Sequence, residues 1–193
     1  MNPRIILASA SPQRKTLLEG LGVQFEVMPS SVDEDGHPER SPRERSVILS
    51  RLKAEDIAAK HKGAIVIGCD TLVVSSTGEL LEKPKDPEDA RRMLESQSGA
   101  LSQVHSAVSI IDAKGTVHEG VSTSTVRFKQ LSSKDMDWWV STGLWRGRSG
   151  GFQIDGLGQL MISHIEGDWT GIVGLPVFLV GELMKAAGCE LRG

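Results

Sequence analysis

The sequence predicts an α/β fold in which a mixed central sheet is flanked by helices. Short apolar runs without alternation, such as residues 64–68, are typical of strands covered on both faces. Segments with apolar residues at helical spacing lie between these runs. The length of 193 residues suits one α/β domain, or two small lobes that share a core, and we expect a single domain over residues 1–193.

The first half of the chain is expected to place strands and helices in turn. Ser11-Pro12 and Ser41-Pro42 each supply an N-cap and a proline suited to the first helical turn. We therefore predict strands at 4–8, 24–28 and 64–68, a helix from 12 whose stop is marked by Gly20 and Gly22, and a helix from 42 to about 60. The apolar strand at 64–68 ends at Cys69-Asp70-Thr71.

The second half is expected to begin with a hairpin of strands at 72–74 and 79–81, which turns near Gly78 and delivers Lys83 to the neighbourhood of Asp70. Glycines are dense between 143 and 158. The remaining predicted elements are helices at 86–97, 132–141 and 176–187, and strands at 104–111, 121–128 and 159–165.

Composition excludes several classes of protein. The formal net charge of −3 argues against a protein that coats a nucleic-acid polymer. The amino terminus has too short an apolar run for a signal peptide, and no stretch is apolar enough to span a membrane. Cys69 and Cys189 have no metal-ligand spacing, so we expect neither a disulfide framework nor a zinc site, and a cytoplasmic location.

The turn from the first strand into the first helix is a candidate phosphate site. Ser9, Ser11 and Arg14 surround a helix N-terminus, whose unpaired N–H groups attract anions. The alternative is an ordinary capped helix with a surface arginine.

Two carboxylates and two lysines form a second candidate set. Asp70 and Glu34 are an adequate protein ligand set for Mg²⁺, which takes one or two carboxylates with phosphate oxygens and water. Lys53 and Lys83 could neutralise charge that develops on phosphates. Taken separately, Asp70 could cap a turn and each lysine could be a solvated surface charge.

The order of motifs along the chain resembles the Maf family of nucleotide pyrophosphatases, also called septum formation proteins. The matching segments are LASASPQRKTLLEGLG, VDE, LSRLKAEDIA, VIGCDT, GELLEKPKD, ARRMLESQSG, GGFQIDGLG and IEGDWTGIVGLP. This ordered set covers nearly the whole chain and is far more specific than any one motif.

The resemblance implies a fold like that of inosine triphosphate pyrophosphatases, with two lobes, a cleft between them and a homodimer. It implies hydrolysis of a nucleoside triphosphate to the monophosphate and diphosphate with Mg²⁺ or Mn²⁺. Asp70 would accept the proton, Glu34 and Asp70 would hold the metal, and Lys53 and Lys83 would line the phosphate site. Ser9 and Arg14 match positions near the triphosphate.

The positions that separate the substrate classes of the family are mixed in this chain. Members resembling dTTP/UTP pyrophosphatases carry SPRR, a Thr after the catalytic Asp, and IQG. Here Gln13 replaces the first arginine, Thr71 agrees, and Asp155 replaces the glutamine. The 7-methyl-GTP class has Trp, Gln and Glu at these three places. A carboxylate only accepts hydrogen bonds, so Asp155 weakens the pyrimidine interpretation, whereas Thr71 supports it.

Two further readings stay open at this point. The chain could be a nucleotide-binding regulator of cell division with little turnover, or a small-molecule binding domain whose charged residues are structural. In the last case Lys83→Ala would leave catalysis unchanged.

Overall fold

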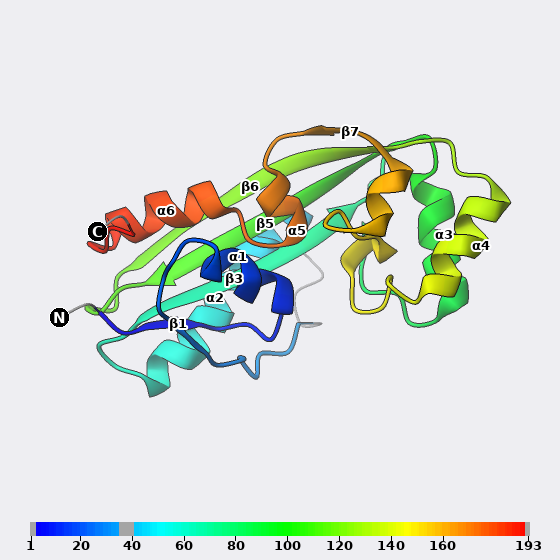
Figure 1. Cartoon of the computed structure of the whole chain (residues 1–193). Coiled ribbons are helices and arrows are strands. Elements are labelled where there is room, and N and C mark those ends of the chain that lie inside the picture. Colours follow the sequence, from blue (N-terminus) through cyan, green and yellow to red (C-terminus); the bar gives the residue numbers. More distant parts are fainter. Residues whose placement is uncertain (1–2, 35–40, 192–193) are drawn as a thin grey trace. The chain divides into compact units, whose positions relative to one another are not determined.

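The computed structural model describes residues 3–34 and 41–191 (Figure 1). Its strands are β1 (Ile5–Leu7), β2 (Glu26–Val27), β3 (Ile65–Val74), β4 (Leu80–Leu81), β5 (Leu101–Ile111), β6 (Val117–Phe128) and β7 (Ile162–Glu166). Its α-helices are α1 (Pro12–Glu19), α2 (Pro42–Lys60), α3 (Pro87–Gln97), α4 (Ser133–Thr142), α5 (Trp169–Val173) and α6 (Val177–Ala186), and two short 3₁₀ helices are η1 (Ser149–Gly151) and η2 (Leu157–Met161). Within these ranges no helix is both long enough and apolar enough to cross a bilayer.

The strands of the described chain pair in the order β2-β1-β3-β5-β6-β7, and β4 pairs with β3. β1 runs parallel to both β2 and β3, whereas β4 is antiparallel to β3 and β7 is antiparallel to β6. The sheet is therefore mixed, and the predicted α/β class with flanking helices is confirmed.

The chain divides into two compact units, which are described separately. Unit 1 contains residues 1–70, 106–122 and 174–193, and unit 2 contains residues 71–105 and 123–173. Strands β3, β5 and β6 have residues in both units.

Unit 1 has helices on both faces of its strands, and the two-residue period of a strand decides which side chain meets which helix. Ile5, Leu7, Ile65 and Ile67 lie in one apolar cluster with residues of α1 and α6. Ile6 of β1, Ala8 just after it and Val66 of β3 lie in another cluster with residues of α2. The even-numbered positions of β3 that belong to unit 1 therefore face α2.

Gly68 allows α2 to approach β3 closely. A Cβ atom added at Gly68 would lie 2.1 Å from the carbonyl oxygen of Ser50 and 2.8 Å from the amide nitrogen of Ala54, both on α2. Only a residue without a side chain fits such a separation. The close approach brings the neighbouring turns of α2 over the even-numbered face of β3.

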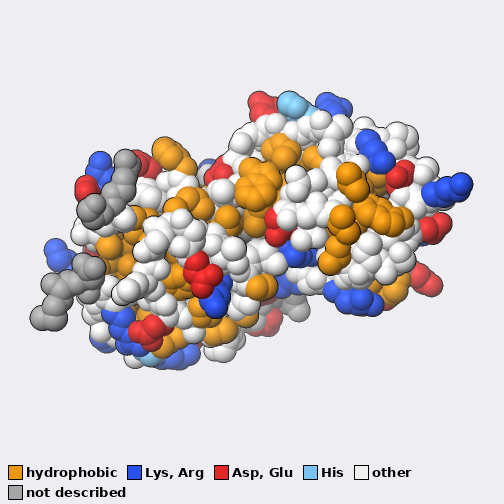
Figure 2. All heavy atoms as spheres, in the orientation of Figure 1, with side chains coloured by type: hydrophobic (Ala, Val, Ile, Leu, Met, Phe, Trp, Pro, Cys, Tyr) orange, Lys and Arg blue, Asp and Glu red, His pale blue; other side chains and the backbone are white. Residues whose placement is uncertain are grey.

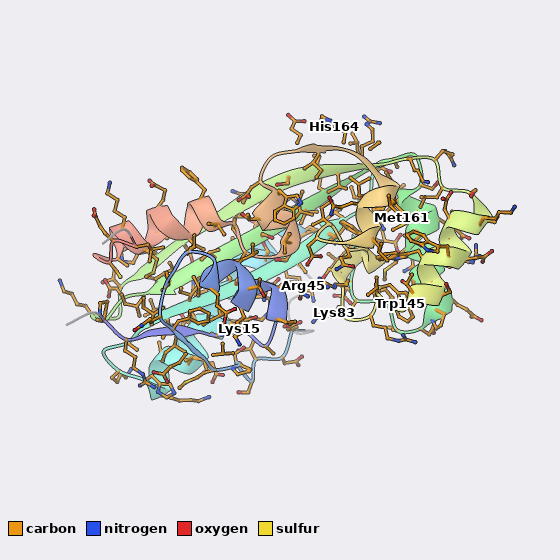
Figure 3. All side chains as sticks on the ribbon, viewed as in Figure 1. Lys15, Arg45, Lys83, Trp145, Met161 and His164 are labelled. Atoms are coloured by element: carbon orange, nitrogen blue, oxygen red, sulfur yellow. The ribbon has the colours of Figure 1, made fainter. Side chains whose placement is uncertain are left out.

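Unit 2 has its own apolar core. The core includes Trp139 and Phe128, which are almost completely buried, and Trp145 and Met161, which Figure 3 labels. The rings of Phe128 and Phe152 meet edge to face with centroids 5.2 Å apart. The indole N–H of Trp139 donates to the carbonyl of Gly151 at 2.7 Å, which ties α4 to the glycine-rich segment.

Helices α1, α2, α3, α4 and α6 match the predicted ranges closely, whereas α5 was not predicted. Strands β5 and β6 begin three and four residues earlier than predicted, and two other strands differ more. β3 does not end before Asp70 but continues to Val74, because Val73 and Val74 pair with β4. The predicted strand at 159–165 is the helix η2 followed by β7. A Cβ at Gly158 would lie 2.1 Å from the carbonyl oxygen of Gln153, so the chain turns tightly there before it can extend.

Candidate active site

A cluster of three charged side chains lies in unit 1. Lys53 Nζ is 2.6 Å from Asp70 Oδ1 and 2.7 Å from Glu34 Oε1. Lys53 is 5% exposed and Asp70 is 4% exposed, whereas the side chain of Glu34 is 45% exposed. The buried ammonium of Lys53 therefore lies between the buried carboxylate of Asp70 and the partly exposed carboxylate of Glu34.

The fold explains why Lys53 and Asp70 meet. Asp70 is an even-numbered residue of β3 and so follows Val66 and Gly68 on the face that α2 covers. β1 ends at Leu7 opposite Ile67, so Asp70 lies three residues past the last paired position of this parallel pair. Polar side chains beyond the carboxyl end of a parallel strand are commonly at ligand sites.

Helix α2 supplies Lys53 from a well-defined start. Ser41 Oγ accepts a hydrogen bond from the Glu44 N–H, and the Glu44 carboxylate accepts one from the Ser41 N–H, which is a complete capping box. The helix then runs without interruption to Lys60. Ser50 is buried on the same helix and shares a hydrogen bond of 2.8 Å with Ser109 of β5, which fixes the rotation of α2.

The second oxygen of Asp70 is buried and, among the described residues, has no hydrogen-bond partner. A buried carboxylate oxygen without a partner is costly unless a ligand or water meets it. The described residues contain no group of three or more His, Cys, Asp or Glu that could hold a metal ion. Asp70 and Glu34 nevertheless fit Mg²⁺ or Mn²⁺, because such ions use one or two carboxylates with phosphate oxygens and water.

The β1–α1 turn of unit 1 holds Ser9, Ser11 and Arg14 together. Arg14 Nη1 donates to Ser9 Oγ at 3.1 Å, and Arg14 Nε donates to the carbonyl of Gly174 at 2.9 Å. Ser11 Oγ caps α1 by accepting from the Arg14 N–H and donates to Gln13 Oε1 at 3.3 Å. The capped helix is thus observed, and its cap places the serines and the guanidinium at one turn.

Lys83, Thr71 and Asp155 belong to unit 2. Lys83 is exposed in the segment between β4 and α3. Asp155 forms an ion pair with Arg148, with Nη1 and Oδ1 3.8 Å apart, and both side chains are only about a quarter exposed, at 25% and 22%. Ser149, which follows Arg148 in the chain, donates from its hydroxyl to the carbonyl oxygen of Thr71 at 3.4 Å. Two of the three predicted base positions are therefore linked through residues 148–149.

The model of the family described as Maf-like protein matches residues 4–187. The chain belongs to the Maf family. This Maf protein is 38% identical over 182 residues to a protein of Pyrococcus furiosus, with 94% of each chain covered. It is 40% identical over 191 residues to a protein of Deinococcus radiodurans, with 99% of this chain and 96% of the relative covered. Both relatives are named dTTP/UTP pyrophosphatase.

A solved structure from Mycobacterium abscessus, a nucleoside-triphosphatase described as a dITP/XTP pyrophosphatase, aligns with a TM-score of 0.44 at 16% identity. The alignment covers 67% of this Maf protein and 76% of that chain. A similarity this low supports no inference about the site, and the predicted likeness to inosine triphosphate pyrophosphatases stays a prediction.

Two arginines of this Maf protein were missed by reasoning from the sequence. Arg45 lies on α2, is 6% exposed, and donates from Nη2 to the carbonyl oxygen of Glu34 at 2.8 Å. Arg148 pairs with Asp155. The only signal for Arg45 is its spacing of eight residues from Lys53, which puts both on one side of a helix. For Arg148 the signal is that a basic residue lies shortly before Asp155, the acidic residue that replaces the glutamine of IQG.

Proposed function

We propose that this Maf protein is a nucleoside triphosphate pyrophosphatase, which converts a nucleoside triphosphate and water to the monophosphate and diphosphate. The observation that carries the proposal is the buried ammonium of Lys53 between Asp70 and Glu34, with one Asp70 oxygen left unpartnered among the described residues. Buried charges of this kind are uncommon in a purely structural role and cluster at functional sites.

Asp70 is proposed to accept the proton of the attacking water. A carboxylate has about four lone-pair positions on its two oxygens, and Lys53 occupies one of them on Oδ1, so Oδ2 remains able to bind. The water oxygen forms a bond to the α-phosphorus, the bond from that phosphorus to the bridging oxygen breaks, and diphosphate leaves. The proton of the water passes to Asp70.

We propose that Asp70 and Glu34 hold Mg²⁺ or Mn²⁺, which would neutralise charge on the phosphate oxygens when bound. Lys53 pairs with both carboxylates and holds them in position. Arg14 and Ser9 are assigned to the triphosphate, since a guanidinium at a helix N-terminus suits phosphate oxygens. Lys83 is assigned to the phosphates through the family resemblance.

The names of the relatives favour a thymine or uracil base, and the residues of unit 2 suggest how Asp155 can serve it. A glutamine amide can donate to a pyrimidine carbonyl and accept from its N3–H, whereas Asp155 can only accept. Arg148 lies beside Asp155 and supplies N–H donors. The Arg148–Asp155 pair therefore offers both a donor and an acceptor, as a single glutamine does.

A 7-methyl-GTP pyrophosphatase is the second candidate, because the carboxylate of Asp155 suits the adjacent N1–H and N2–H donors of guanine. The two candidates separate in one experiment. Pure protein is incubated with dTTP, UTP, CTP, GTP or 7-methyl-GTP, with Mg²⁺ or with Mn²⁺, and diphosphate is measured. We expect release from dTTP and UTP. Release from 7-methyl-GTP alone would favour the second candidate, and no release from any nucleotide would reject hydrolysis.

We also propose a homodimer in the cytoplasm. The homodimer rests on the family resemblance. Both cysteines, Cys69 and Cys189, are free and buried, which suits a reducing compartment. Figure 2 shows acidic and basic side chains interspersed on the face that it presents, in keeping with the small net charge.

A further inference from the structure

Residues 31–34 form an irregular segment that is fastened to helix α2 at three points. Ser31 donates to Asp56 Oδ2 from its N–H at 2.9 Å and from its hydroxyl at 3.2 Å. The Glu34 carboxylate meets Lys53 at 2.7 Å. The Glu34 carbonyl accepts from Arg45 Nη2 at 2.8 Å. Side chains of α2 therefore hold this segment at both of its ends.

The dimensions of the two segments explain why a long side chain is needed at position 45. Asp56 and Arg45 are separated by about 16 Å along the helix axis, at 1.5 Å per residue. Three residues of extended chain, from Ser31 to Glu34, span at most about 11 Å. The segment therefore cannot reach the turn of α2 that carries Arg45, and the side chain of Arg45 covers the remaining distance.

Arg45 Nη2 donates to the main chain of Glu34, whereas the ammonium of Lys53 meets the Glu34 carboxylate. Arg45 is 6% exposed, and arginine is seldom buried so completely unless its guanidinium is used. The side chain of Glu34 is 45% exposed on a segment without regular structure, so its direction is well defined only if the backbone that carries it is also held. A second contact, at its own carbonyl, fixes the backbone from which the carboxylate projects.

We propose that Arg45, labelled in Figure 3, is a positioning residue that fixes Glu34 toward Lys53 and Asp70. The assignment of a catalytic role to Glu34 rests on the proposed function, whereas the fastening of residues 31–34 by Arg45 does not. Arg45 acts through the main chain of Glu34 and need not touch the substrate. Its loss displaces a carboxylate, and a displacement of about 1 Å at a reacting group can lower a rate by about 100-fold.

The test compares Arg45→Met and Arg45→Lys with a control, Arg51→Met. Arg51 lies on the same helix but pairs with Glu119, outside the cluster. Each variant is made in the wild-type chain and in Glu34→Gln, and kcat/KM is measured with UTP and Mg²⁺. Hydrogen exchange of Ser31–Glu34 is followed in the same proteins, and thermal unfolding shows that each is folded.

We expect Arg45→Met to lower kcat/KM by about 10- to 100-fold in the wild-type chain and to have little further effect beside Glu34→Gln. Exchange at Ser31–Glu34 becomes faster. Arg45→Lys shows a smaller change in the same direction, because a single ammonium keeps a donor but not the planar fork. Arg51→Met leaves both quantities unchanged.

A folded Arg45→Met variant with wild-type kcat/KM and unchanged exchange would overturn the proposal, as would an equal loss in both backgrounds. If Arg45→Met does not fold, Arg45→Lys must show the same pattern or the proposal fails. Wild-type protein that releases no diphosphate from any nucleotide would reject the proposed function instead. The exchange of Ser31–Glu34 would then decide alone whether Arg45 fastens this segment.

Discussion

The two units of this Maf protein each hold an acidic group beside a basic one, in very different surroundings. In unit 1, Lys53 and Asp70 are both about 95% buried and 2.6 Å apart. In unit 2, Arg148 and Asp155 are 3.8 Å apart and about a quarter exposed. The Lys53–Asp70 pair is shielded from water, whereas in the Arg148–Asp155 pair water competes with each partner for the charge of the other.

The difference matters because the same charges interact more strongly where water is excluded. A buried pair is costly to form and still more costly to break, since the survivor is left without a partner. A partly exposed pair contributes little to stability and can exchange its partner for a ligand. We therefore assign chemistry to the cluster of unit 1 and recognition of the base to the pair of unit 2, and each assignment can be broken separately.

The largest expected effect is on catalysis in unit 1. Asp70→Asn removes the proposed proton acceptor while keeping the shape of the side chain, and we expect diphosphate release to fall by about 100- to 10,000-fold. The matched control is Asp137→Asn on α4, which removes an exposed partner of Arg91. The control should keep wild-type activity. A loss of less than tenfold in Asp70→Asn would remove Asp70 from the reaction.

The next effect is on stability. Lys53→Met leaves Asp70 buried without its counter-ion, and we expect the free energy of unfolding to fall by about 3–5 kcal/mol. Because this loss comes from the unpaired carboxylate, the double variant Lys53→Met with Asp70→Asn should recover much of the free energy of unfolding. Urea unfolding measures the stability of the single and the double variant. Lys60→Met, which removes an exposed lysine paired with Asp56, is the control and should have a small effect. Equal stability of Lys53→Met and the control would show that the buried pair contributes nothing.

The predicted base positions should respond in selectivity rather than in stability. Asp155→Gln in unit 2, combined with Gln13→Arg in unit 1, introduces the residues of the dTTP/UTP class at both positions. Arg148 and Asp155 supply the donor and the acceptor from two side chains instead of one amide, and a polar group of the base that is left without a good partner costs about 1–3 kcal/mol. We therefore expect the preference for dTTP and UTP over other nucleotides to rise by about 5- to 150-fold. Competition assays with paired nucleotides measure the ratio. Unchanged ratios would mean that these two positions do not read the base.

The smallest effect concerns an acidic residue outside both groups. The carboxylate of Asp112 accepts hydrogen bonds, of which the one from the Thr116 N–H has the largest effect. These bonds lower the pKa of Asp112 from its ordinary value of 3.8 to about 2. A lowered pKa stabilises the folded state above pH 4, and this contribution is lost as the pH falls toward 2. The excess of the wild-type unfolding temperature over that of Asp112→Asn should therefore shrink between pH 5 and pH 2. A constant difference would show that Asp112 has no such role.

Much of the fold could be predicted because local chemistry determines it. Ser41-Pro42 predicts the start of α2, and the observed capping box confirms this prediction. The hairpin of residues 72–74 with 79–81 was predicted, and the pairing of Val73 with Leu81 confirms it. The continuity of β3 from Ile65 to Val74 was not predicted, because Cys69-Asp70-Thr71 interrupts the apolar run.

The candidate site divides in the same way. Lys53 and Asp70 were predicted, and they meet because the periods of a helix and a strand bring them to one interface. Arg45 was not predicted, since its partner is the main chain of Glu34 in an irregular segment whose path depends on contacts with α2. Carbonyl groups are present at every position, so a sequence gives no sign of which one a buried arginine will meet.

The most direct test of the account is to run the reaction in water enriched in ¹⁸O and to analyse the products by mass spectrometry. Attack at the α-phosphorus, with Asp70 as proton acceptor, predicts that one ¹⁸O enters the nucleoside monophosphate and none enters the diphosphate. Asp70→Asn should slow this labelling without changing its position. Label in the diphosphate or in free phosphate would contradict the proposed reaction.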